Sequence, residues 1–525
     1  MFTFELSRLR LPNSLPVRLH LVVALLAALF TFQPTQSPAQ ETNLAAIQTL
    51  IRQSKLDDAN KQLQAILQKQ PTNAKAMGLM GIVLRRQGDW VEAEAQFRRA
   101  VAVAPQSLDA CENLGALLRD EARWPEAASR YESCRKLAPR NFSIGADLAA
   151  AYQKNGEYAK SLTMVKTIPP ANRSVKLLPV IAADYVALND LQNAEPAIAD
   201  VLRHAPTDPE LVPALANSFL DHGMAKDAAE LLQLAQGPQK PTPSFLSALA
   251  RTQASSGKQQ EARQSMDQAI RLDPKSQDSL AVAASLAMLW GQWDKSLEFL
   301  DAALAAGPPR TDLLQSVVYA EMRKNDLQAA HDVAQRWHTL RPDESAGALA
   351  FAVVLVEGNH WGEARPLLEQ VLAKSPNDKG ALLAMGVVQY NAGDLAAAKK
   401  YLSGAVGGGP DDANAYFFLG LIAKQQGDFS AAIAAMKQSV SIQARNPKAL
   451  GQLGQLYLQE NDVPSARTVL EQAIEQAPDE PQNHYELARV YNKLDRKADA
   501  EEQLKLYQKL RPQRPKSPEA ETPPR

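Results

Sequence analysis

Residues 74–107 read AKAMGLMGIVLRRQGDWVEAEAQFRRAVAVAPQS, and this stretch decides the fold. Apolar residues recur at helical spacing on both sides of the Gly-Asp-Trp sequence at 88–90, which is a turn signal. The small residues Gly81 and Ala93 flank that turn, where they allow two antiparallel helices to approach closely. Pro105 ends the second helix because proline cannot continue it. We therefore predict a helical hairpin here.

The same pattern returns every 34 residues along the chain. Prolines in this register are Pro71, Pro105, Pro139, Pro274, Pro308, Pro342, Pro376, Pro410, Pro478 and Pro512. Ala444 occupies the one step without proline, and Pro206 lies two periods before Pro274. Only the interval from Pro139 to Pro206 departs from the register, by one residue. A period of this length indicates a stack of repeated units.

Two further positions in the register are small in nearly every unit. The first is Gly81, Gly115, Ala149, Ala216, Ala250, Ala284, Ala352, Gly386, Gly420, Gly454 or Ala488, with Val318 as an exception. The second is alanine in most units, with Ser161 and Ser296 as near equivalents. The turn residue between them is Gly88, Gly156, Gly223, Gly257, Gly291, Asn325, Asn359, Gly393, Gly427 or Asn461. Glycine and asparagine tolerate the left-handed backbone that ends a helix.

Period, register and residue types resemble the tetratricopeptide repeat. The resemblance extends from about Gln40 to about Arg514, and residues 74–107 show it best. It implies an all-α fold, a right-handed superhelical solenoid of about 14 helix-turn-helix repeats. We expect repeats 1–4 in residues 40–174, irregular repeats 5–6 in 175–242 and repeats 7–14 in 243–514.

The least regular part of the solenoid is expected between residues 166 and 243. Residues 166–174 carry the one-residue deletion, and residues 237–243 (GPQKPTP) are dense in helix breakers. This segment is either a change of superhelical pitch or ordinary sequence drift. The chain ends in a proline-rich stretch, residues 515–525, which we expect to be disordered.

The first 39 residues have the order of a secretory signal. Arginines precede a short apolar run from Leu21 to Phe32, and small residues follow at Ser37-Pro38-Ala39. We predict cleavage after Ala39 and a periplasmic or secreted protein, with an uncleaved N-terminal anchor as the alternative. No second apolar segment of membrane length follows, so we expect no membrane span after signal removal.

Composition and motifs argue against several function classes. The formal net charge is −1, which gives no strong field for nucleic acid. None of the seven histidines forms a metal-binding pair, and no catalytic serine elbow or phosphate-binding loop occurs. We therefore expect no enzyme activity, no metal and no cofactor, and protein partners of unknown identity.

Two cysteines fall on the two helices of the third predicted repeat. Cys111 lies on the first helix and Cys134 on the second. Antiparallel helices bring these positions to a similar level, so a disulfide is feasible in an exported protein. The alternative is a pair of small buried side chains.

A candidate partner-binding groove lies on the first helices of repeats ten to twelve. In the family these helices line the concave side, and their outward face should be polar if it faced only water. The face is instead apolar: Leu349, Val353, Val356, Leu383, Val387, Tyr390, Phe417 and Leu421. Either these residues form a groove for an apolar peptide or helix, or they touch each other across a tight superhelix.

The resemblance also implies a function. Long exported arrays of this kind are similar to periplasmic tetratricopeptide scaffolds of bacterial secretion and exopolysaccharide systems. We therefore expect a non-catalytic scaffold or adaptor in the bacterial cell envelope that holds a partner peptide or helix in its concave groove. The alternative is an accessory subunit of an exopolysaccharide, glycan-processing or secretion complex whose chemistry lies on a partner chain.

Overall fold

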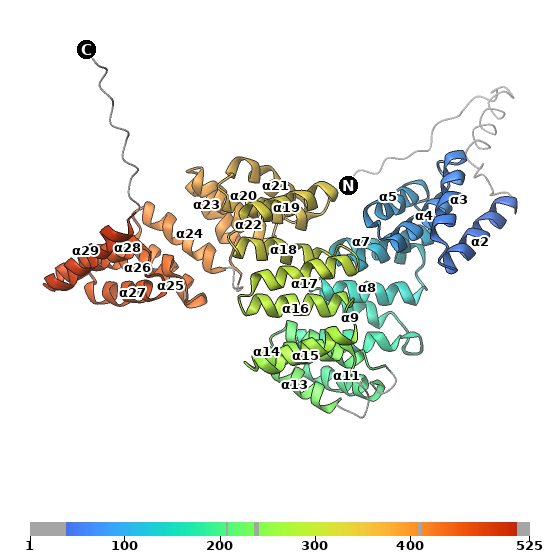
Figure 1. The fold of residues 1–525 in the computed structure, drawn as a ribbon, viewed down its shortest axis with the longest axis horizontal. Coiled ribbons are helices and arrows are strands. Elements are labelled where there is room, and N and C mark those ends of the chain that lie inside the picture. Colours follow the sequence, from blue (N-terminus) through green and yellow to red (C-terminus); the bar gives the residue numbers. More distant parts are fainter. Residues whose placement is uncertain (1–37, 206–207, 236–240, 408–411, 512–525) are drawn as a thin grey trace, which may run out of the picture. The chain divides into compact units, whose positions relative to one another are not determined.

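A computed structural model describes residues 38–205, 208–235, 241–407 and 412–511 of the chain (Figure 1). These residues form 28 α-helices and two short 3-10 helices, and none of them is in a β-strand. The predicted all-α class is confirmed. The predicted tail and nearly all of the predicted signal lie outside the described residues, apart from Pro38 and Ala39 at the start of the first helix.

The helices pair into 14 hairpins, as predicted from the sequence register. The first seven hairpins are α2 (Pro38–Arg52) with α3 (Leu56–Lys69), α4 (Ala74–Gln87) with α5 (Trp90–Val103), α6 (Leu108–Asp120) with α7 (Trp124–Leu137), α8 (Phe142–Lys154) with α9 (Tyr158–Lys166), α10 (Leu178–Ala187) with α11 (Leu191–His204), α12 (Leu211–Asp221) with α13 (Ala225–Leu234), and α14 (Pro243–Ser255) with α15 (Gln259–Leu272). The other seven are α16 (Gln277–Leu289) with α17 (Trp293–Ala306), α18 (Thr311–Arg323) with α19 (Leu327–Leu340), α20 (Ser345–Glu357) with α21 (Trp361–Lys374), α22 (Lys379–Asn391) with α23 (Leu395–Ala405), α24 (Asp412–Gln425) with α25 (Phe429–Ile442), α26 (Pro447–Gln459) with α27 (Val463–Gln476), and α28 (Pro481–Lys493) with α29 (Lys497–Leu510).

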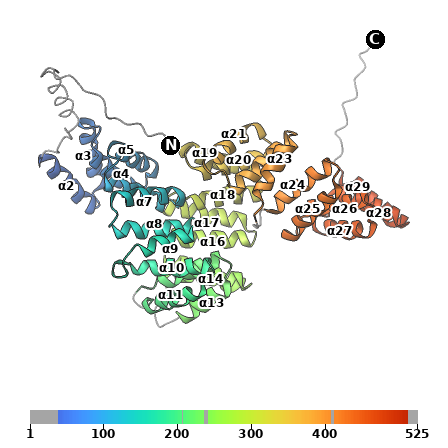
Figure 2. The same cartoon turned by 180° about the vertical axis from the view of Figure 1, so that it is seen from behind.

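The helices group into two compact units. The described part of the first unit comprises residues 38–117 and 130–140, and the second comprises 118–129 and 141 onwards. Within the second unit, the first helices of successive hairpins pack side by side, as α14, α16 and α18 do in both views (Figures 1 and 2). This stacking covers the apolar face that each hairpin leaves open.

Every hairpin turn contains one residue with positive φ. All ten predicted turn residues adopt this geometry, for example Gly88 at 86° and Asn325 at 65°. The remaining turns use Ser54, Ala122, Asn189 and Asp495. The side chain of Asp89 then accepts a hydrogen bond from the Glu92 N–H and starts α5, and aspartates in many other turns cap their second helix in the same way.

In most hairpins, a small residue on the first helix faces a large residue on the second. A Cβ atom added at Gly81 would lie 2.5 Å from Phe97, and one at Gly386 would lie 2.5 Å from Leu402. Both distances are too short for real atoms. The predicted small positions are therefore places where the two helices touch, and the second series of small residues is buried as well.

The structure explains why Val318 departs from the pattern. Its opposite residue on α19 is Ala334, whereas the other hairpins place a bulky side chain there, such as Leu368 opposite Ala352. Val318 and Ala334 are both buried in one apolar cluster. The larger side chain is thus on the first helix and the smaller one on the second, and the space between the helices remains filled.

The segment from residue 166 to 243 differs from the other repeats in helix length. Helices α9, α10 and α13 have nine, ten and ten residues, whereas most other helices have 13 or 14. Two 3-10 helices, Pro170–Asn172 and Val175–Leu177, connect α9 to α10. The shorter helices follow from the prolines and the deletion that the sequence places here.

A buried ion network joins the α6–α7 turn to repeats nine and ten, all within the second unit. Arg341 lies 2.6 Å from Glu121, and Arg123 lies 3.1 Å from the other oxygen of the same carboxylate. Arg341 also pairs with Glu344, which accepts a hydrogen bond from the Trp337 ring at 2.8 Å. The four charged side chains are each at most 4% exposed.

This turn is unusual in its backbone too. Ala122, between Glu121 and Arg123, has a φ of 56°, a conformation that costs a residue with a Cβ atom about 1 kcal/mol. The Thr311 N–H donates to the Glu121 carbonyl oxygen at 2.9 Å. These contacts connect residues roughly 200 positions apart in sequence, so the 34-residue register does not predict them.

The Val318–Ala334 exchange gives a test of hairpin packing. We expect Ala334→Leu to overpack the hairpin and destabilise it by about 1–3 kcal/mol. Adding Val318→Ala restores the small–large arrangement of the other hairpins and should recover much of that loss. Hydrogen exchange of α18 and α19 reports the local stability. Equal protection in the single and double variants would contradict the packing scheme.

The ion network gives a second test. Arg341→Met leaves two buried carboxylates short of a cation, so we expect a loss of about 3 kcal/mol, seen as a lower thermal midpoint. The matched control is Arg203→Met, because Arg203 is 70% exposed and its pair with Asp200 should contribute less than about 1 kcal/mol. Similar midpoints for the two variants would show that the network does not hold the turn in place.

Candidate functional site

The eight apolar residues predicted to form the groove lie on three successive first helices. Helix α20 carries Leu349, Val353 and Val356, helix α22 carries Leu383, Val387 and Tyr390, and helix α24 carries Phe417 and Leu421. Val356 is buried, and the other seven side chains are half-buried. The structure therefore brings the residues onto adjacent helices, with each side chain already partly covered.

Neighbouring hairpins provide that cover. Leu349, Val353 and Val387 pack on a buried cluster that includes Ala352 and Met385, and Leu383 packs on the cluster around Leu402. Phe417 and Leu421 pack on the cluster around Met436. The apolar face thus serves first to stack one hairpin on the next. What remains open is a stripe of partly exposed side chains rather than eight free ones.

An aromatic group lies on this stripe and includes a residue that the sequence pattern missed. The Phe418 ring lies 5.5 Å from the Tyr390 ring and 5.5 Å from the Phe417 ring, centroid to centroid. Helical spacing assigned only Phe417 to the outward face. The two consecutive phenylalanines were the available signal, since adjacent large rings on one helix can reach the same neighbour.

A polar group borders the stripe at its α24 end. Lys424 follows Leu421 by three residues, so the two share a helix face. Its ammonium group donates to the side-chain oxygens of Gln452 and Gln455 on α26, both at 2.7 Å. Burial lowers the pKa of Lys424 below its ordinary value. The apolar stripe therefore ends at one half-buried cation held by two amides.

Titratable side chains form no metal-binding cluster in the part of the chain that the structure describes. No group of three or more histidine, cysteine, aspartate or glutamate side chains in that part of the chain could hold a metal ion. Burial raises the pKa of Asp184 on α10 to about 7. The hydroxyl of Ser161 and the amide of Gln153 act in the opposite direction on the same carboxyl group. His331 and His338 both lie against the Phe351 ring.

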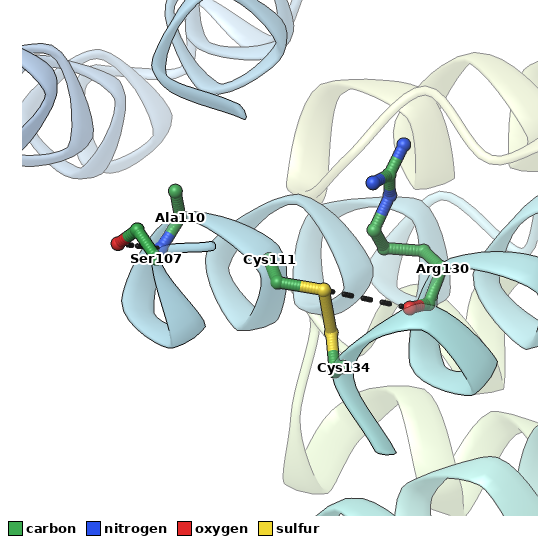
Figure 3. Close-up of a disulfide and its surroundings, with 5 residues drawn as sticks. All are labelled: Ser107, Ala110, Cys111, Arg130 and Cys134. Atoms are coloured by element: carbon green, nitrogen blue, oxygen red, sulfur yellow. Dashed lines mark hydrogen bonds between the residues drawn. A yellow bond between two sulfur atoms is a disulfide. The ribbon is translucent and has the colours of Figure 1, made fainter. Parts of the chain in front are cut away.

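The two cysteines form a disulfide between α6 and α7 (Figure 3). Their Cα atoms are 5.6 Å apart, within the range that a disulfide spans. Both residues are buried, at 3% and 0% exposure. The bond lies in the first unit and joins residues 23 positions apart across the third hairpin.

Comparison with known proteins identifies the repeats. Models of the family described as tetratricopeptide repeat match residues 44–107, 247–311, 355–422 and 423–484. The matched residues are tetratricopeptide repeats. The matched hairpins follow the 34-residue register found in the sequence. The tetratricopeptide fold is associated with binding other proteins. No curated protein matches the chain.

Several solved structures are similar to this chain at low identity. The Cut9–Hcn1 hetero-tetramer of APC/C is 12% identical, with 85% of this chain and 95% of that chain covered and a TM-score of 0.43. A tetratricopeptide repeat protein from Parabacteroides merdae is 17% identical, with 47% and 98% covered and a TM-score of 0.41. PilF of Pseudomonas aeruginosa is 16% identical, with 39% and 93% covered and a TM-score of 0.36.

In the part of the chain that the structure describes, no helix combines the length and the apolar character needed to cross a bilayer.

The disulfide gives a chemical test. We expect protein trapped in acid from intact cells, then denatured and treated with a maleimide reagent, to show no free thiol. Prior reduction should expose two, Cys111 and Cys134. Two reactive thiols without reduction would show that the pair is reduced in the cell. Cys111→Ser and Cys134→Ser variants, each with one thiol, calibrate the assay.

Proposed function

We propose that this protein is a non-catalytic scaffold of the bacterial cell envelope that holds a segment of a partner protein against α20, α22 and α24. The observation that carries the proposal is the apolar stripe on these three first helices. It runs from Leu349 to Leu421 and includes the rings of Tyr390, Phe417 and Phe418. Partly exposed aromatic residues on a rigid surface are the usual anchors of a protein interface.

The chemistry of the stripe favours one kind of partner segment. Its half-buried side chains can bury a further row of apolar side chains, as in the recognition of a helix or extended peptide by a groove. Lys424 at the α24 end keeps a hydrogen on its ammonium group beyond the two that reach Gln452 and Gln455. A carboxylate that follows the apolar part of the segment would pair with it.

Two features support a location outside the cytoplasm. The first 39 residues have the order of a secretory signal. The disulfide between Cys111 and Cys134 is a bond that persists in oxidising compartments such as the periplasm.

The stripe is tested with substitutions that keep side-chain shape. Val353→Thr with Val387→Thr places two hydroxyls in the stripe, and we expect a purified partner to bind about tenfold more weakly. The partner is first captured from an envelope extract with the wild-type protein. The matched control is Val333→Thr with Val440→Thr, half-buried valines on the second helices α19 and α25.

The binding result is interpreted against the control variant. If the stripe and control variants bind the partner as the wild type does, the stripe is not the binding surface. Thermal midpoints of the two double variants should agree, because the four valines are buried to a similar extent. Osmotic-shock fractionation of the same strain places the protein, and recovery only with the cytoplasm would contradict the envelope location.

A further inference from the structure

A second apolar groove lies in hairpins five and six, among α10, α11, α12 and α13. Its volume is about 370 Å³, and its floor is formed by buried side chains of Val186, Ala194, Phe219 and Leu231. The groove uses the second helices α11 and α13, whereas the stripe described above uses first helices. It lies in the segment whose helices are shortest.

The walls of this groove carry two of the most exposed leucines in the described chain. Leu191, the first residue of α11, is 63% exposed, and Leu234, the last residue of α13, is 67% exposed. The side chains of Ile198 and Met224, both half-buried, complete the apolar lining. Exposed leucines beside a buried apolar floor lose water contact only when another molecule covers them.

The rim of the groove is acidic. Glu195 on α11 and Asp227 and Glu230 on α13 are all exposed and line the groove, and no basic residue among those that the structure describes lines it. Among the described residues, none of these three carboxylates has an ion-pair partner, although many other exposed carboxylates of the chain do. Three carboxylates around an apolar floor produce a negative potential over it.

We propose that this groove binds a cationic amphipathic segment of a partner protein. Apolar side chains on one face of the segment fill the space between Leu191 and Leu234. Lysine or arginine side chains beside them pair with Glu195, Asp227 and Glu230. Apolar and basic residues at helical spacing supply both contacts from one short helix.

The charge of the rim argues against the other occupants of an apolar groove. In a twofold dimer of this chain, the acidic rim of one copy would face the acidic rim of the other. Like charges at close range repel each other. An anionic membrane surface would be repelled for the same reason. A cationic segment is the occupant whose charge complements the rim.

A synthetic peptide tests the proposal directly. The probe is a labelled helix of about 14 residues with leucines at i, i+3, i+4 and i+7 and lysines on the flanking positions. Anisotropy titration into the full-length protein should show saturable binding that weakens as salt rises, because the charged contacts are exposed to solvent. A peptide with glutamates in place of the lysines should not bind.

Variants of the protein locate the site. Leu191→Ser with Leu234→Ser should weaken binding of the lysine peptide at least about tenfold. Asp227→Asn with Glu230→Gln should weaken it and reduce the salt dependence. The matched controls are Leu289→Ser, since Leu289 is 64% exposed and outside the groove, and Asp267→Asn with Glu298→Gln on α15 and α17. The controls should bind as the wild type does.

Three results would overturn the proposal. The first is equal binding of the lysine and glutamate peptides. The second is an equal loss of binding in the leucine and control variants, which would indicate nonspecific hydrophobic binding of the peptide. The third is a dimer, measured by sedimentation, that Leu191→Ser with Leu234→Ser converts to a monomer, because a second copy would then be the occupant. None of these outcomes bears on the stripe of α20, α22 and α24, which these substitutions leave intact.

Discussion

The close approach of two helices within each hairpin is the constraint on which the rest of the structure depends. Gly81 against Phe97 and Gly386 against Leu402 leave no space for a Cβ atom at either glycine. Such contact sets how the first helix lies on the second, and therefore which face the hairpin presents to its neighbour. The Val318–Ala334 pair shows that the requirement concerns total volume and not the identity of one residue. Stacking then follows, because a single hairpin cannot cover its own apolar face.

A second kind of contact is independent of the repeat. Glu121, Arg123, Arg341 and Glu344 are buried together, and the turn residue Ala122 between the first two has a strained backbone. Buried charges are costly to dehydrate and remain stable only while each has its partner. The geometry of that turn therefore depends on repeats nine and ten, and a change in either part is expected to disturb the other. In a solenoid held together by nearest neighbours alone, such a dependence would be absent.

The stripe and the groove both stay partly open after the hairpins have stacked, and their chemistry differs. The stripe on α20, α22 and α24 is apolar and aromatic and ends at Lys424, which suits an apolar segment with a carboxylate. The groove between α11 and α13 has exposed leucines and an acidic rim, which suits a cationic segment. A scaffold with two sites of opposite preference could hold two different segments, either from two partners or from one. The proposed function depends on the first surface, and the second adds a partner class to it.

The sequence alone determined the repeat. Period, small positions and turn residues are local properties of each unit, so they predicted the 14 hairpins and the ten glycine and asparagine turns. Burial of a side chain depends on neighbouring units. For this reason the sequence predicted Val353, Val387 and Phe417 to be more exposed than they are, and it did not assign Phe418 to the stripe. The Glu121–Arg341 pair and the groove at Leu191 and Leu234 were decided by tertiary structure. Ion pairing across 220 residues and the packing of shortened helices both depend on where the chain lies in space, which no local pattern encodes.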